Sequence, residues 1–364
     1  MNLVDALAAD VGPRPAGTDA ASRAADLVAE AFRELGLEPR FQEFDLVGYD
    51  ADEPELEVEG EPWAVGPCMY AHSFAGEGTI KRIGSSPAPV GDDRLANFAV
   101  VDESGREVAR LLTSPFSTGA IPFMSTHVQI TTPPTAFVSI ADAQRLDDGM
   151  RVRMKVGGRF LPGRRERNVI ADIPGRGEGH VVVSAHYDSV WRGPGAIDNA
   201  TGVEGVRRVG EALVERDLDR GVRLVAFAAE EIKLTGSRYY VDEANLREEL
   251  DAVKGVVNLD CIAHGEKLQI LASPEALLGR AVEAARLLGL LDRYELATGP
   301  ATGGVDSHWF AERKVPAVTL LHFPYDEYHL PAESSALVDP QRMDDSVALA
   351  LQLVESQLRN PLPR

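Results

Sequence analysis

The stretch His180-Val-Val-Val-Ser-Ala-His186-Tyr-Asp188 is a short apolar run that ends in a histidine, with a carboxylate two positions later. Its length and its valines predict a buried β-strand. From about residue 155 onward, similar apolar runs alternate with segments whose apolar residues recur at helical spacing. This alternation is typical of a layered α/β domain, in which helices cover a central sheet.

The predicted elements cover most of the chain outside residues 48–150. Residues 2–36 are expected to be helical with a break at 11–15, and a strand is expected at 40–47. Further strands are predicted at 168–173, 181–183, 222–228, 253–259, 268–271 and 317–321. Further helices are predicted at 203–214, 236–243, 274–288, 307–312 and 343–358.

Residues 48–150 have a different character. Helical periodicity is lost there, and short β-rich runs such as Asn97–Val101 and Thr135–Ser139 alternate with Gly, Pro and Ser. A chain of 364 residues is long enough for one large domain and a smaller one. We therefore expect residues 1–47 and 151–364 to form the larger domain, and residues 48–150 to form a β-rich inserted domain.

Charge and cysteine content exclude several classes of protein. The chain carries 37 basic and 57 acidic side chains, a formal net charge of −20. This charge repels phosphate, so neither nucleic acid nor an anionic membrane is an expected partner. Cys68 and Cys261 are too few for a disulfide framework and form no CxxC motif. The first residues do not resemble a secretory signal and no apolar run reaches about 18 residues, so a cytoplasmic location is expected. The oligomeric state is not predicted.

Polar side chains follow four of the predicted strands at the point where each strand ends. His186 and Asp188 follow the first, Glu230 and Glu231 the second, and Asp260 the third, whereas the last leads through His322 into a loop that carries His329. In open α/β sheets, sites form beyond the carboxyl ends of the strands. Imidazole and carboxylate without thiolate are the ligands expected for Zn²⁺ or a similar divalent ion.

One further position, and the roles of three residues already named, complete this hypothesis. Asp198 lies in the turn-rich stretch Gly195-Ala-Ile-Asp198-Asn199-Ala-Thr-Gly202, where a carboxylate could bridge two metal ions. Of the neighbours Glu230 and Glu231, one can bind metal while the other acts as a general base. Asp188 could accept the N–H of the His186 ring and so fix its tautomer.

The order of these motifs resembles the M28 zinc peptidases, the co-catalytic aminopeptidase family. The order is His-x-Asp at 186–188, Gly-Ala-x-Asp-Asn at 195–199, Glu-Glu at 230–231 followed by Gly-Ser, Asn-x-Asp at 258–260 and a late His at 329. The resemblance covers residues 1–45 and about 165–350. It implies an α/β fold with a mixed central β-sheet flanked by helices on both faces, the zinc aminopeptidase fold. Residues 48–150 resemble the protease-associated type of inserted domain that some members carry.

Carried over position by position, the resemblance implies a role for each residue. His186 and Asp260 would hold one Zn²⁺, Glu231 and His329 the other, and Asp198 would bridge the pair. Glu230 would be the general base, and the bond between Asp198 and Asn199 would be cis. Co²⁺ or Mn²⁺ would also suit these ligands. The implied activity is that of an aminopeptidase acting on peptides.

The sequence departs from the family at two points. Val305-Asp306-Ser307-His308 stands where Ser-Asp-His is common, so His308 receives no role. Cys261-Ile-Ala-His264 stands where Met-Ile-Gly is common, which puts the pocket lining in doubt.

Simpler interpretations of single residues stay open. Glu230-Glu231 could begin a solvated helix and Asp198 could cap one. His322 competes with His329 as a ligand, although we favour His329.

Other activities on the same scaffold also stay open. A carboxypeptidase would use a cation such as Arg192 to receive the carboxylate of its substrate, and a glutaminyl-peptide cyclase would need one metal. A non-catalytic binding protein would have lost ligands or the base, whereas all of these positions are occupied here.

Overall fold

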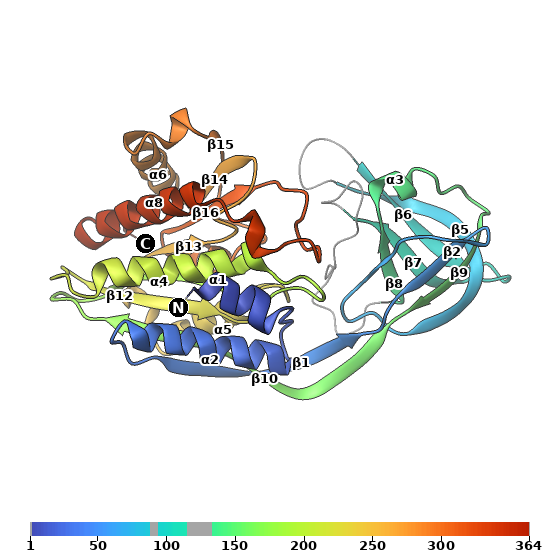
Figure 1. Ribbon diagram of the computed structural model, residues 1–364, viewed down its shortest axis with the longest axis horizontal. Coiled ribbons are helices and arrows are strands. Elements are labelled where there is room, and N and C mark those ends of the chain that lie inside the picture. Colours follow the sequence, from blue (N-terminus) through green and yellow to red (C-terminus); the bar gives the residue numbers. More distant parts are fainter. Residues whose placement is uncertain (1, 88–93, 115–132, 364) are drawn as a thin grey trace.

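The computed structural model describes residues 2–87, 94–114 and 133–363. Its strands form two separate β-sheets. In Figure 1 the larger, helix-covered part and the smaller β-rich part lie side by side, joined by the long strands β1 (Arg40–Ala51) and β10 (Gly158–Ile173). These two strands pair antiparallel along their length, from Arg40 opposite Ile170 to Ala51 opposite Gly158. The connection between the two parts is therefore a two-stranded ribbon, whose register shifts once, between Leu46 and Gly48.

The sheet of the larger part has the order β1-β10-β12-β11-β13-β16-β14-β15. Its remaining strands are β11 (His180–His186), β12 (Gly221–Phe227), β13 (Val253–Leu259), β14 (Lys267–Ser273), β15 (Glu295–Gly299) and β16 (Ala317–Phe323). The central strands β12, β11, β13 and β16 are parallel, whereas β10 and β14 run antiparallel to their neighbours β12 and β16. The sheet is therefore mixed, and its parallel centre places the carboxyl ends of four strands at one edge.

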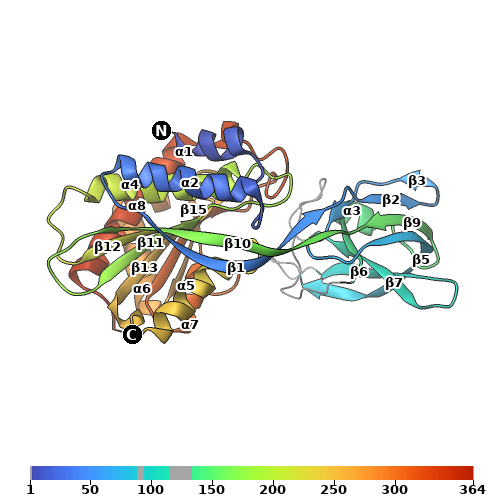
Figure 2. The ribbon, with the colours of Figure 1, turned by 90° about the horizontal axis from the view of Figure 1, so that it is seen from below.

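Helices cover both faces of this sheet (Figure 2). Helices α2 (Asp19–Glu34), α4 (Gly202–Leu213) and α8 (Pro340–Arg359) pack on one face, and α5 (Thr235–Leu246) and α7 (Ser307–Glu312) pack on the other. The short α1 (Leu3–Asp5) continues into a π-helix at Ala6–Val11, and α6 (Glu275–Leu287) packs against β14 and α8. A strand that is buried on both faces reads as a continuous apolar run, which explains the valines of β11.

The second sheet has the order β3-β2-β9-β5-β6-β7-β8-β4. Its strands are β2 (Glu55–Val58), β3 (Glu61–Pro62), β4 (Gly66–Pro67), β5 (Phe74–Pro87), β6 (Arg94–Val101), β7 (Glu107–Thr113), β8 (Thr135–Val138) and β9 (Arg151–Val156), with the short helix α3 at Ile140–Ala143. It has a hydrophobic core of its own around Phe98 and Leu111. The division at residues 48 and 150 stays a prediction, and β9 pairs within this second sheet.

The predicted elements differ from the observed ones mainly at their ends. The strand predicted at 168–173 is the last part of the longer β10, and α8 begins at Pro340, three residues before the predicted start at 343, where Asp339 caps its first turn. Strand β15 was not predicted because its residues are half-buried and show no apolar run. Among the described residues, no helix is long and apolar enough to cross a membrane. The cytoplasmic location stays a prediction.

Candidate metal centre

The ends of the parallel strands bring the predicted residues together. His186 is the last residue of β11, Asp260 directly follows β13, and Glu230 and Glu231 lie just beyond β12. Asp198 lies in the turn that precedes α4, and His329 lies in the loop after β16. Because neighbouring parallel strands end at the same edge, residues far apart in sequence meet there.

The ligand atoms form two groups, and Asp198, a member of the second, also lies next to His186 of the first. One atom each from His186, Glu230 and Asp260 lies within 4.8 Å of the others, and the same holds for Asp198, Glu231 and His329. His186 Nε2 lies 3.0 Å from Asp198 Oδ1 and 3.6 Å from Asp260 Oδ1. His329 Nε2 lies 3.1 Å from Asp198 Oδ2 and 3.2 Å from Glu231 Oε1. The two oxygens of Asp198 thus face different histidines, which is the arrangement that a bridging carboxylate requires.

Because the acids of this cluster are buried, their negative charges destabilise the folded state unless a cation balances them. Burial raises the pKa of Glu230 well above its ordinary value, and the charges of Glu231, Asp306 and Asp260 raise it further. Burial alone would lower the pKa of His329, yet Glu231 and Asp198 raise it well above its ordinary value. Asp198 Oδ1 and Glu231 Oε1 are buried, and among the described residues neither accepts a well-aligned hydrogen bond, although a histidine Nε2 lies 3.0 Å from the first and 3.2 Å from the second. Buried histidine and carboxylate donors with open acceptor positions fit divalent metal ions such as Zn²⁺.

Comparison with known proteins agrees with this geometry. The sequence pattern of peptidase family M28 matches residues 168–354, just over half of the chain and the whole span from His186 to His329. The chain belongs to peptidase family M28.

Curated relatives of this M28 peptidase include aminopeptidases. It is 38% identical over 135 residues to leucine aminopeptidase 2 of Arthroderma otae, a match that covers 35% of this chain and 27% of that protein. It is 25% identical over 288 residues to aminopeptidase YwaD of Bacillus subtilis, covering 72% of this chain and 61% of that protein. The chain therefore spans only about a quarter of the length of the leucine aminopeptidases that it matches.

Solved structures confirm the predicted fold of the M28 peptidase. BSAP, a zinc aminopeptidase from Bacillus subtilis, aligns with a TM-score of 0.73 at 20% identity and covers 97% of this chain and 92% of its own. A peptidase M28 precursor from Shewanella amazonensis aligns with a TM-score of 0.79 at 20% identity, covering 100% and 95% of the two chains. The mixed sheet flanked by helices is therefore the zinc aminopeptidase fold.

In this M28 peptidase, Asp188 has a contact that was not foreseen. Its carboxylate is fully buried and accepts the backbone N–H groups of Glu230 at 3.0 Å and of Glu231 at 3.3 Å. His186 Nδ1 lies 3.2 Å from the backbone oxygen of Asp188 and 3.6 Å from its Oδ1. Asp188 therefore positions the pair of glutamates, and its main-chain oxygen is the nearer partner for the histidine ring.

The turn that carries Asp198 has the predicted cis peptide bond between Asp198 and Asn199, which confirms that expectation. The Asn199 side chain donates a hydrogen bond to the backbone oxygen of Leu259 at 2.9 Å and accepts one from the N–H of Cys261 at 3.2 Å. These bonds tie the turn to the end of β13. Gly195 opens the turn with a φ of 60°, and a Cβ there would lie 2.4 Å from the Asp198 backbone oxygen. Only glycine fits this position without displacement.

The choice between the two late histidines follows from their surroundings. His322, on β16, lies with Nδ1 3.1 Å from Arg342 Nη1 and packs edge-on against Tyr294. Burial and the charge of Arg342 lower its pKa to about 4. The structure brings His329 into the cluster and leaves His322 beside an arginine.

Three residues near the cluster were missed by sequence reasoning. Arg14 is fully buried, and its guanidinium donates to the backbone oxygens of Tyr187 at 2.5 Å, Pro194 at 2.5 Å and Gly195 at 2.8 Å. Burial lowers its pKa to about 10, so it stays charged at neutral pH. The only signal for Arg14 was its place between two prolines at a helix break.

The other two missed residues are acids. Glu333 is buried and accepts backbone hydrogen bonds from both the Asp198 turn and the His329 loop. Asp306 is fully buried, and burial raises its pKa to about 7 although the charge of His186 opposes that shift. Glu333 stands in no local motif that distinguishes it from a surface acid, whereas Asp306 lies in Val305-Asp306-Ser307-His308, a stretch to which sequence reasoning assigned no role.

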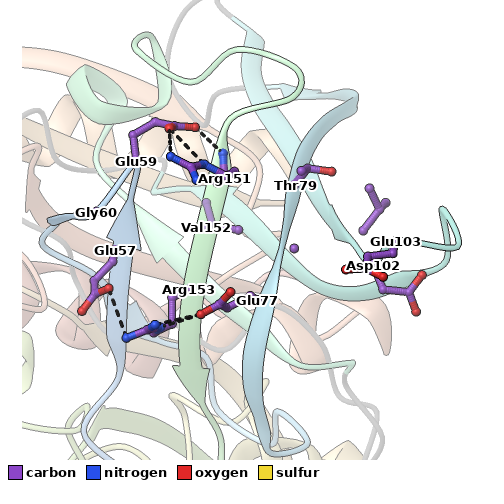
Figure 3. A pocket seen from close by; sticks show the side chains of 12 residues that line it. Glu57, Glu59, Gly60, Glu77, Thr79, Asp102, Glu103, Arg151, Val152 and Arg153 are labelled. Carbon is purple, nitrogen blue, oxygen red and sulfur yellow. Dashed lines mark hydrogen bonds and ion pairs between the residues drawn. The ribbon is translucent and has the colours of Figure 1, made fainter.

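A hollow on the second sheet also gathers acids, but its chemistry differs (Figure 3). Arg151 pairs with Glu59 at 3.2 Å, and Arg153 pairs with Glu77 at 2.8 Å and Glu57 at 3.7 Å. Each of these carboxylates therefore has a cationic partner from the neighbouring strand β9. Among the described residues that line the hollow, none has a buried side-chain oxygen left without a hydrogen-bond partner.

Proposed function

We propose that this M28 peptidase is a two-metal aminopeptidase that removes N-terminal residues from peptides. The observation that carries the proposal is the position of Asp198, whose two oxygens lie 3.0 Å and 3.1 Å from the Nε2 atoms of His186 and His329. His186 and Asp260 would hold one ion, Glu231 and His329 the other, and Asp198 would bridge them. Zn²⁺ is the ion that the donor set favours, and Co²⁺ or Mn²⁺ would also bind.

The chain's own residues would divide the catalytic work between them. When bound, two divalent ions supply Lewis acidity for the scissile carbonyl and a water of lowered pKa. Glu230 would accept the proton of the attacking water and pass it to the leaving amine. Asp188 would hold Glu230 and Glu231 in place through their backbone N–H groups.

Substitution of the base tests this assignment. Glu230→Gln keeps the shape of the side chain but removes its basicity, so metal content should stay unchanged while kcat falls by about 10²- to 10⁴-fold. Elemental analysis and steady-state kinetics on aminoacyl substrates measure both quantities. Wild-type turnover in Glu230→Gln would show that another group is the base.

The competing activity is that of a carboxypeptidase. Arg192, the cation considered for a substrate carboxylate, pairs with Glu53 and is half-exposed. Hydrolysis of free dipeptides without hydrolysis of their N-acetylated forms, abolished by a chelator, is the result expected for an aminopeptidase. Preference for the N-acetylated forms would favour the carboxypeptidase.

The inserted region is a separate part of the proposal. We assign residues 48–150 to a protease-associated type of domain, supported by a sheet and a hydrophobic core distinct from those of the larger part. Proteolysis at its borders that releases a folded fragment would support the assignment.

A further inference from the structure

One buried carboxylate connects the two loops that carry the bridging aspartate and the last histidine. Glu333 is 1% exposed and lies four positions after His329. Its Oε1 accepts the backbone N–H of Ile197 at 3.0 Å and that of Asp198 at 2.7 Å. Its Oε2 accepts the backbone N–H of His329 at 3.1 Å. Both oxygens are therefore occupied by main-chain donors from segments far apart in the sequence.

These contacts fix the main chain at two ligand positions at once. Asp198 Oδ2 and His329 Nε2 lie 3.1 Å apart. The Glu333 carboxylate accepts a hydrogen bond from the backbone N–H of each of these two residues. Hydrogen bonds from backbone N–H groups to a carboxylate are among the stronger ones in proteins. Glu333 belongs to the same loop as His329 and reaches across to the Asp198 turn, so the separation of the two ligands depends on this one side chain.

We propose that Glu333 is a positioning residue that sets the spacing between Asp198 and His329 and thereby the affinity for the second metal ion. The inference rests on the proposed two-metal centre. His186 and Asp260, which would hold the other ion, make no hydrogen bond with Glu333 in the described part of the chain. Loss of Glu333 should therefore lower the affinity of the metal position at Glu231 and His329 more than that of the position at His186 and Asp260. A general loss of stability would lower both affinities alike.

Glu333→Gln is the sharpest variant because it keeps size and shape. One of its two ends becomes an amide NH₂ group, a donor that must face a backbone N–H where an acceptor stood. Glu333→Asp keeps both acceptors on a shorter side chain and should restore part of the effect. Asp345→Asn is the matched control, since Asp345 is also a buried acid and binds Arg293 and Tyr294 away from the cluster.

The first measurement needs no metal. Hydrogen exchange of metal-free protein should be faster in Glu333→Gln than in wild type at residues 195–202 and 327–333, and unchanged at 256–262. In Asp345→Asn the first two segments should exchange as in wild type. Unchanged exchange at both loops in Glu333→Gln would overturn the proposal.

The second measurement is a titration of metal-free protein with Co²⁺, followed by its absorption. The second dissociation constant should rise by about 10- to 100-fold in Glu333→Gln, the usual effect of removing a group that orients a metal ligand. The first should stay within about threefold of wild type. An equal rise of both dissociation constants would show that Glu333 is needed only for stability, and it would overturn the proposal. Wild-type protein that binds one Co²⁺ would contradict the two-metal centre, while hydrogen exchange would still decide whether Glu333 positions the loops.

Discussion

Two groups of carboxylates in this molecule have similar numbers of acids but differ in burial and in the partners that neutralise their charge. In the hollow on the second sheet, Glu59 and Glu77 are 45% and 68% exposed and pair with Arg151 and Arg153. At the edge of the first sheet, the side chains of Asp198 and Glu231 are 4% and 10% exposed and face histidines and other acids. Exposed ion pairs contribute about 0–1 kcal/mol each, because water already solvates both partners.

The difference shows that the place of an acid in the fold matters more than the number of acids. A carboxylate at the end of a buried parallel strand loses water and needs a cation to replace it. Arg14 supplies one fixed positive charge beneath the cluster, but its donors are directed to backbone oxygens. The remaining negative charge is what a metal pair would neutralise.

The largest expected effect comes from removing the bridging carboxylate. Asp198→Asn should weaken the binding of both ions and reduce kcat/KM by more than about 10³-fold, since the metal pair and its nucleophile depend on it. Glu77→Gln in the hollow should leave both quantities unchanged. Equal effects of Asp198→Asn and Glu77→Gln on metal content would contradict the conclusion that only the buried group of acids binds metal.

The next largest effect concerns the buried arginine. Arg14→Met should lower the free energy of unfolding by about 3–5 kcal/mol, because it leaves several buried backbone oxygens without a donor. Arg153→Met, which removes an exposed partner, should change it by about 0.5 kcal/mol or less. Urea unfolding of metal-free protein measures both. A loss below about 1 kcal/mol for Arg14→Met would show that these bonds are not important for stability.

A smaller effect should appear in the pH dependence of the metal-free protein. Burial raises the pKa of Asp306 to about 7, and nearby carboxylates raise that of His329 above its ordinary value. For both groups the folded state binds protons more tightly than the unfolded state, so their contribution is present at low pH and is lost as pH rises through the folded pKa. Thermal stability without metal should therefore fall as pH rises from about 4 to about 7, between the ordinary and the folded pKa of Asp306, and fall further above about pH 6.5, where unfolded His329 loses its proton.

Zinc should flatten that pH dependence, because metal ions replace the protons in the cluster. Melting temperatures of the metal-free and zinc-loaded forms at matched pH values measure this difference. A metal-free protein that becomes more stable towards pH 8 would contradict the assignment of these groups.

Much of the fold and most of the ligand set could be predicted from the sequence. Apolar runs such as the one ending at His186 mark buried parallel strands, and the rule that sites form beyond their carboxyl ends places His186, Glu230 and Asp260 together. Strand β9 was not predicted, although its alternation of exposed and buried residues is the pattern of a half-buried strand, because the predicted strands were taken from continuous apolar runs.

Arg14 and Glu333 could not be predicted, since each acts on backbone groups of segments that are distant in sequence. Arg14 binds Gly195, and Glu333 binds Asp198, across 181 and 135 positions. Backbone acceptors and donors have no residue identity, so no motif records such a contact.

The central claim is that two cations lie on either side of Asp198. Anomalous diffraction at the zinc edge from crystals of the zinc-loaded protein tests it most directly. Two peaks are predicted, one between His186 and Asp260 and one between Glu231 and His329, both adjacent to the Asp198 carboxylate. A single peak, or zinc bound elsewhere with none beside Asp198, would contradict the account.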